Sequence, residues 1–238
     1  MVASRSAESV VLAAAGGALG AVAGSLVGLT VPGAVVAGLN GLISGRRRIY
    51  DWSTPKGLMA FALDSTWALA TTTSALVAHG VAALQSDPGY AAELSERRNR
   101  HVYARGLRIR RRFAITLGNV VNGAGDVSRP RRARLVTDHE DVHVWQERWF
   151  GPLFPVLYGG WMVGGAVAAS GTWIVGRRHP FAPYVEACAY YLNPFEWWAY
   201  SRDAHWPPSG MLAGVGWRRP AVRSFASRRD VQVVSDTL

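Results

Sequence analysis

The feature that most constrains this chain is a run of 35 uncharged residues from Val10 to Ser44. A helix needs roughly 20 apolar residues to cross the hydrocarbon core of a bilayer, so the run is long enough for a membrane segment. A small residue recurs in it every four positions, at Gly16, Gly20, Gly24 and Gly28 and then at Gly33, Ala37, Gly41 and Gly45. Small residues at this spacing let two helix backbones approach closely. We therefore predict a membrane helical hairpin within residues 1–52 that turns near Pro32.

The spacing resembles that of glycine-zipper membrane segments. This resemblance implies a homo-oligomer or packing with partner membrane helices. Two alternatives are an Ala/Gly-rich segment buried in a protein core and a cleaved signal peptide that ends near Ala23. The signal peptide is disfavoured because the apolar run continues well beyond any such cleavage site.

Two further stretches are apolar. Residues 57–84 include Asp64 and His79, so this stretch is expected either to be buried among other helices or to lie at the membrane interface. Residues 152–176 carry no charge and are followed by Arg177 and Arg178, which is typical of a membrane span.

The charge balance indicates on which side of the membrane the chain lies. The formal net charge is +10, with eight arginines from Arg97 to Arg112 and four from Arg129 to Arg134. By the positive-inside rule, this central region is expected on the cytoplasmic side of the plasma membrane, beside anionic membrane lipids. We expect no nucleic-acid partner, because the basic residues form no recognition motif. Cys188 is the single cysteine, which excludes an intrachain disulfide and a cysteine metal cluster.

Residues His139, Glu140 and His143 form the pattern H-E-x-x-H. No glycine or proline interrupts residues 131–150, so a helix is expected there that ends at Gly151 and Pro152. Residues four apart share one helix face, so both imidazoles can bind one divalent metal ion. The alternative is an amphipathic helix with two surface histidines.

A catalytic zinc ion usually has three protein ligands, so a third ligand is expected downstream. Glu196 is the preferred candidate, because Asn193 and Pro194 are typical of the start of a helix. Alternatively, Glu196 occupies the capping-box position and bonds the backbone of Asn193. The other candidates are Glu186, Asp203, His205 and His179.

The motif and the later N-P-F-E-x-x-A-Y element together resemble the zincin metallopeptidases, in particular the gluzincin pattern. The extension through Gln146 to H-E-x-x-H-x-x-Q also resembles a group of uncharacterised bacterial membrane proteins. The resemblance covers roughly residues 135–203. It implies zinc bound by His139, His143 and Glu196, with Glu140 as the general base. Tyr200 follows Glu196 by four residues and is a candidate donor to the oxyanion, with a core or interfacial tyrosine as the alternative.

Residues 108–121 alternate apolar and polar side chains, which predicts a strand that turns at Asn122 and Gly123. Such a strand ahead of the motif helix could form the edge against which a substrate lies. The fold is expected to be mainly α: a membrane hairpin at 1–52, an apolar helical segment at 53–96, a small zincin-like helical region with one or a few strands at 97–210, and a basic tail at 211–238.

Two predictions conflict. If residues 152–176 crossed the bilayer once, the two histidines and Glu196 would lie on opposite sides and could not share a metal ion. Either Glu196 is not a ligand, or the segment does not cross, or residues 181–200 return into the membrane. Two functions therefore stay open. One is a membrane-anchored zinc hydrolase, most readily a peptidase, and the other is a noncatalytic membrane assembly protein with a structural metal site.

Overall fold

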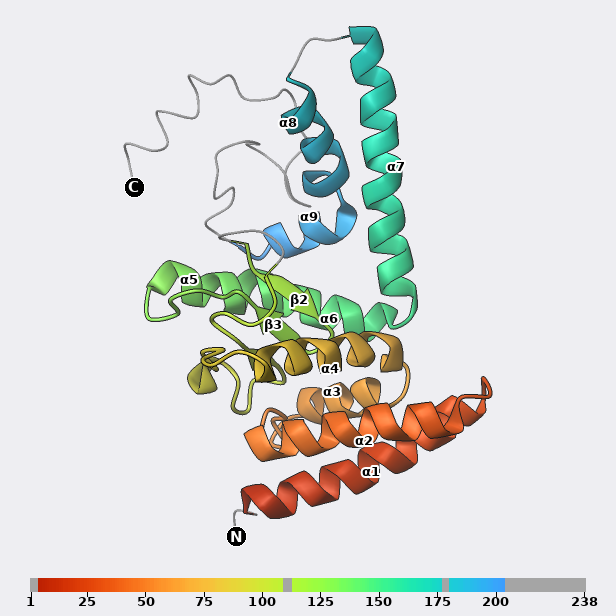
Figure 1. The fold of residues 1–238 in the computed structure, drawn as a ribbon, viewed down its shortest axis with the longest axis vertical. Helices are drawn as coiled ribbons and strands as arrows, with labels where there is room; N and C mark the ends of the chain where they lie inside the picture. Colours follow the sequence, from red (N-terminus) through yellow and green to blue (C-terminus); the bar gives the residue numbers. More distant parts are fainter. Residues whose placement is uncertain (1–3, 109–112, 177–179, 204–238) are drawn as a thin grey trace. The chain divides into compact units, whose positions relative to one another are not determined.

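The chain is mainly helical with a small sheet (Figure 1). This computed structural model describes residues 4–108, 113–176 and 180–203. The chain forms two compact units, residues 1–154 and 155–238. The first unit contains α1 (Arg5–Ser25), α2 (Thr30–Arg47), α3 (Pro55–Ser65), α4 (Leu69–Ala83), the 3-10 helix η1 (Ala92–Leu94), three short strands, α5 (Pro130–Arg134), the π-helix η2 (Leu135–Glu140) and α6 (Asp141–Phe150). The second contains nearly all of α7 (Leu153–Gly176), together with α8 (Phe181–Glu186), the π-helix η3 (Ala187–Tyr191) and α9 (Pro194–Tyr200).

Helices α1 and α2 form the predicted hairpin, and its turn lies just before Pro32. The chain reverses between Ser25 and Thr30, where Gly28 adopts a φ of 74° that favours glycine. Pro32 lies in the first turn of α2. Backbone N–H groups in the first turn have no partner within the helix, so a proline, which lacks this group, fits there.

The small residues of the two helices face each other within the chain. A Cβ atom added to Gly20 would lie 2.2 Å from the carbonyl oxygen of Gly33, and one added to Gly41 would lie 2.1 Å from that of Leu12. Only a residue without a side chain permits such an approach. The glycine face of α1 is thus covered by α2 of the same chain.

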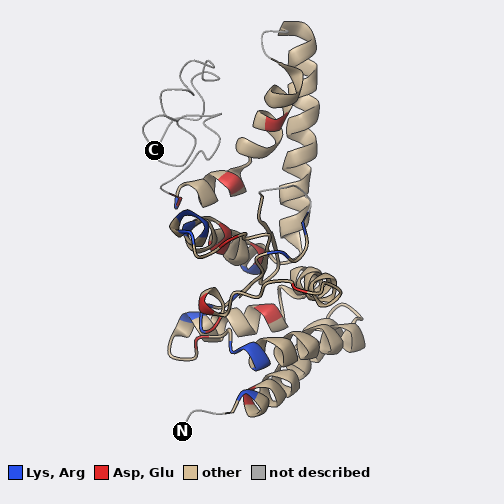
Figure 2. Cartoon of the chain, turned by 60° about the vertical axis from the view of Figure 1, so that its left-hand side comes forward, with Lys and Arg blue, Asp and Glu red and all other residues tan. Residues whose placement is uncertain are grey.

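The outward faces of these helices are apolar. Leu26 is 84 % exposed and Val31 is 71 % exposed, and Figure 2 shows α1 and α2 without charged residues along most of their lengths. Helices α1 and α7, with 21 and 24 residues, are long and apolar enough to cross a membrane.

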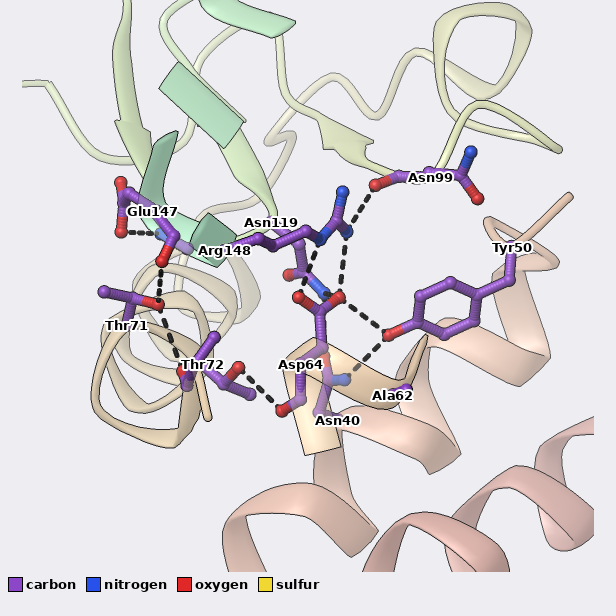
Figure 3. A network of polar contacts seen from close by, with 12 residues as sticks. Asn40, Tyr50, Ala62, Asp64, Thr71, Thr72, Asn99, Asn119, Glu147 and Arg148 are labelled. Atoms are coloured by element: carbon purple, nitrogen blue, oxygen red, sulfur yellow. Dashed lines mark hydrogen bonds and ion pairs between the residues drawn. The ribbon is translucent and has the colours of Figure 1, made fainter. Parts of the chain in front are cut away.

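Helices α3 and α4 replace the single segment predicted at 57–84, and a buried ion pair joins α3 to α6. The side chain of Arg148 donates to both carboxylate oxygens of Asp64, each at 2.8 Å, and both residues are at most 2 % exposed (Figure 3). One Asp64 oxygen also accepts hydrogen bonds from Tyr50 at 2.9 Å and Asn119 at 3.0 Å. Asn40 of α2 bonds both of these neighbours, so the network links α2, α3 and α6.

The sheet has the order β1–β3–β2, with β1 (His101–Val102) parallel and β2 (Ile115–Leu117) antiparallel to β3 (Val120–Asn122). The predicted strand is therefore shorter, and its turn lies at Gly118 and Asn119 rather than at Asn122 and Gly123. Gly118 has a φ of 57°, and a Cβ atom there would lie 2.4 Å from the carbonyl oxygen of Thr71, so α4 approaches the turn closely. Residues 109–112 of the predicted strand lie outside the described residues.

In the second unit, residues 181–200 return along α7. Tyr184 contacts Thr172 at 3.0 Å, and Tyr158 donates to Glu196 at 2.6 Å. Between these contacts, a Cβ atom added to Gly165 would lie 2.8 Å from the carbonyl oxygen of Cys188. The contacts run in antiparallel order, so the return segment brings Glu196 back to the first turns of α7.

The close approach of α1 and α2 predicts different effects on stability for substitutions at two glycines of one helix. Gly20→Ala should lower the free energy of unfolding by about 1–3 kcal/mol, because the new methyl group overlaps the backbone of α2. Gly17→Ala is the matched control, since its Cβ atom would make an ordinary contact at 3.5 Å. It should leave stability unchanged or raise it by up to about 1 kcal/mol through higher helix propensity. Denaturant unfolding in mild detergent measures both, and equal effects would contradict this packing.

Candidate metal centre

The motif lies on a continuous helical stretch, as predicted. Helical conformation runs from Pro130 to Phe150 and ends at Gly151, whose φ is 51°. The first half of the motif belongs to the π-helix η2 and the second half to α6. π-turns inside α-helices occur frequently at functional sites, but the sequence carried no signal for this one.

The two imidazoles face each other on one side of this helix. Nε2 of His139 and Nε2 of His143 are 3.2 Å apart, and the residues are 3 % and 8 % exposed. Two nitrogens each about 2.05 Å from a tetrahedral ion are about 3.3 Å apart. The separation of the two nitrogens therefore fits a shared metal ion. The alternative of two surface histidines is wrong, because both side chains are buried.

Gln146 fixes the orientation of one imidazole. Its Oε1 is 2.8 Å from Nδ1 of His143, and Gln146 is fully buried. An amide oxygen can only accept, so Nδ1 of His143 donates to it, and in the neutral imidazole this leaves the lone pair on Nε2. A second hydrogen bond of this kind is the usual way in which proteins orient a metal-binding histidine.

Glu140 is buried beside the histidines and is held by the sheet. Thr116 of β2 donates its hydroxyl to Oε2 of Glu140 at 2.7 Å, and Glu140 is 5 % exposed. Thr116 was part of the predicted strand, but sequence reasoning gave it no role. Its hydrogen bond engages Oε2 of Glu140 and leaves Oε1 as the less engaged oxygen.

A second buried acid follows on α6. Oε2 of Glu147 accepts the backbone N–H of Gly118 at 2.7 Å. Burial raises the pKa of Glu147 to about 8, against a lesser lowering by the Gly118 hydrogen bond. Burial therefore favours the neutral form of Glu147, which reduces the negative charge near His143.

The predicted helix start at Asn193 is confirmed in the second unit. The Asn193 side chain accepts the N–H of Phe195 at 3.1 Å, and α9 begins at Pro194. The backbone N–H of Asn193 donates to the carbonyl oxygen of Tyr190 at 3.0 Å. In a capping box, this N–H would instead donate to the side chain of Glu196. Glu196 is 1 % exposed and accepts the hydroxyl of Tyr158 at 2.6 Å. The contact of Tyr158 with Glu196 could not be predicted from the sequence, because the two residues are 38 positions apart.

The other candidates differ from Glu196. Glu186 and Asp203 are partly exposed, whereas His179 and His205 lie outside the described residues. Tyr200 packs in a buried cluster with Ala187 and Tyr191, and its ring stacks on Tyr191 with centroids 6.2 Å apart. This position agrees with the alternative of a core tyrosine. The role of Tyr200 as a hydrogen-bond donor to the oxyanion stays a prediction.

The donor set fits a divalent ion by its chemistry. Two imidazoles and one carboxylate are ligands that zinc accepts in catalytic sites. His139, His143 and Glu196 supply these groups, and all three side chains are buried.

Comparison with known proteins finds no matching family model, no similar curated protein and no similar solved structure.

The raised pKa of Glu147 predicts a pH dependence of stability. The folded state keeps the Glu147 proton up to about pH 8, whereas an unfolded chain releases it near pH 4.5. Its contribution to stability should therefore fall as the pH rises between these values, by at most about 1.4 kcal/mol per pH unit. Glu147→Gln mimics the neutral acid and should remove this part of the slope. Denaturant unfolding from pH 5 to pH 9 compares the two proteins, and parallel curves would contradict the assignment.

Proposed function

We propose that this chain is a membrane-anchored, zinc-dependent hydrolase that cleaves peptide bonds. The observation that carries the proposal is the pair of buried imidazole nitrogens 3.2 Å apart, next to the buried carboxylate of Glu140. A structural zinc site needs only ligands, whereas a hydrolase also needs a general base beside them.

We propose Glu196 as the third ligand. Helix α7 follows α6 after only Gly151 and Pro152, and the return segment carries Glu196 back to the first turns of α7. This path favours the explanation in which residues 181–200 return into the membrane along the span formed by α7. The hydrogen bond from Tyr158 would orient the carboxylate.

When bound, zinc would supply Lewis-acid polarisation of the scissile carbonyl and of an attacking water molecule. Glu140 accepts a proton from that water at Oε1, because Thr116 holds Oε2. The same carboxylic acid then donates the proton to the leaving amine. Gln146 keeps His143 in the tautomer that this arrangement needs.

The position of β2 supports a peptide substrate. β2 is the last strand in the sheet order, and its residue Thr116 contacts Glu140. An extended peptide can add to such an edge through main-chain hydrogen bonds. A bond of that peptide would then lie beside the general base.

The apolar helices support anchoring in the plasma membrane, with the arginine-rich central region in the cytoplasm. Helix α7 is exposed along most of its length, with Ala169 as its buried residue. A long, uncharged and exposed helix is stable where lipid surrounds it. Association between copies of the chain would need other faces than the glycines of α1 and α2, because these already face each other.

We expect two variants to differ, because one should lose zinc and hydrolysis together and the other should lose hydrolysis alone. Wild type purified in detergent should hold about one zinc ion per chain and cleave fluorescently labelled casein. His143→Ala should lose both properties. Glu140→Gln should retain zinc but lose cleavage by at least about 100-fold, because removal of a general base costs that much.

Asp138→Asn is the control, since it changes a neighbouring carboxylate that lies outside the motif. Zinc bound with no cleavage of any protein substrate in wild type would favour the structural metal site of an assembly protein. Wild type without zinc after reconstitution would contradict the hydrolase.

A further inference from the structure

Two buried histidines of the first unit take no part in the candidate metal centre. His79 of α4 is 7 % exposed, and His101 of β1 is fully buried. Their rings meet edge to face, with centroids 4.5 Å apart. His79 contacts Tyr103, which follows β1, and His101 contacts Ser44 of α2. The pair therefore lies where α2 and α4 meet the sheet.

The hydrogen bonds around His79 fix where its proton lies. Arg47, at the end of α2, donates to the hydroxyl oxygen of Tyr103, and this oxygen is 3.0 Å from Nδ1 of His79. A guanidinium can only donate, so the hydroxyl hydrogen of Tyr103 is available to Nδ1, which accepts it. The proton of the neutral ring is then on Nε2, which is buried and has no hydrogen-bond partner among the described residues. A second proton would have to enter at Nδ1 and would displace the hydrogen bond from Tyr103.

His101 is held between two hydroxyl groups. Its Nε2 is 3.1 Å from Oγ of Ser44, and its Nδ1 is 3.1 Å from the hydroxyl of Tyr90. A hydroxyl can donate or accept, so both hydrogen bonds can persist when the ring is protonated. The cost of a positive charge on His101 therefore comes from burial and from repulsion by other charges.

The charged groups that act on the two rings are positive. These groups are Arg47 of α2 and Arg148 of α6, and no carboxylate of the described residues contacts either ring. Burial, and then Arg47, lowers the pKa of His79 to about 3. Burial, and then His79 and the two arginines, lowers the pKa of His101 well below its usual 6.5. Both rings are therefore neutral in the folded chain.

The sign of the resulting pH dependence follows from these directions. A histidine exposed by unfolding binds its proton below about pH 6.5, whereas the two buried rings stay neutral there. The stabilisation that depends on neutral rings is complete above about pH 6.5 and is lost as the pH falls. Each histidine then favours the open state by up to about tenfold per pH unit.

We propose that the two histidines form a pH-sensitive latch, which holds α2 and α4 against the sheet at neutral pH and releases them in mild acid. The contacts that open are those of His79 with Tyr103 and of His101 with Ser44. The glycine packing of α1 on α2 is separate from these contacts and stays closed. The latch goes beyond the proposed hydrolase and requires no zinc.

Hydrogen–deuterium exchange of the full chain in detergent tests the latch, with protection factors measured by mass spectrometry from pH 7.5 to pH 5.0. Amides of α4 and β1 should lose at least about thirtyfold in protection between pH 6.5 and pH 5.0, since two histidines each contribute up to about tenfold per pH unit. Amides of α1 should keep their protection. His79→Gln should reduce the loss at α4 and β1 by at least about tenfold, because a glutamine oxygen can accept from Tyr103 but does not titrate.

Glu93→Gln is the matched control, because Glu93 is an exposed ionisable residue of the nearby helix η1. It should keep the loss seen in wild type. Arg47→Gln is a second variant that leaves both histidines in place, so the test survives if His79→Gln does not fold. A glutamine can still donate to Tyr103 but carries no charge, so the loss of protection should move to lower pH.

Two results would overturn the latch. One is an equal loss of protection in wild type and His79→Gln, or in wild type and Arg47→Gln. The other is a loss that is uniform over α1, α4 and β1, because this would be acid unfolding of the whole unit.

Discussion

The buried ion pair between Asp64 and Arg148 is the interaction on which the first unit depends. Two charges without access to water are costly unless each has a full set of partners. Asp64 has these partners in Arg148, Tyr50 and Asn119, and Arg148 also donates to the carbonyl of Asn99 at 2.6 Å. The partners come from segments far apart in the sequence. The pair therefore gains these partners only when the segments have all assembled, which couples the hairpin, the sheet and α6 into one fold, and among the described residues Nη1 of Arg148 has no hydrogen-bond partner even then.

This coupling also positions the candidate metal centre. Arg148 lies on the same helix as His143, and that helix is further held by Gly118 at Glu147 and by Arg100 at Asp141. The sheet in turn supplies Thr116 to Glu140. The motif residues thus lie on a helix that buried polar contacts fix from two sides. Precise ligand placement requires such support, because a site with loose surroundings does not hold catalytic geometry.

Patterns with a fixed spacing were predictable from the sequence. The helix of His139 and His143, its end at Gly151, the cap at Asn193 and the α1–α2 hairpin all follow from local rules. Contacts between residues distant in the sequence could not be predicted. Asp64 stood out only as a charge in an apolar segment, and nothing in the sequence indicated that Thr116 contacts Glu140 or that Tyr158 contacts Glu196. The hairpin turn predicted near Pro32 lies just before that residue, because proline also fits the first turn of a helix. The turn predicted at Asn122 was wrong because tertiary packing against α4 selected Gly118.

We propose that one zinc ion is bound by both histidines of the motif together with a carboxylate. X-ray absorption spectroscopy of the zinc-loaded protein tests it most directly, because the outer-shell scattering of imidazole is distinctive. We expect a shell of nitrogen and oxygen ligands at about 2.0–2.1 Å, with scattering from two imidazoles that falls to one in a His139→Ala protein. A shell with no imidazole scattering, or a spectrum unchanged in His139→Ala, would rule out binding by this histidine pair.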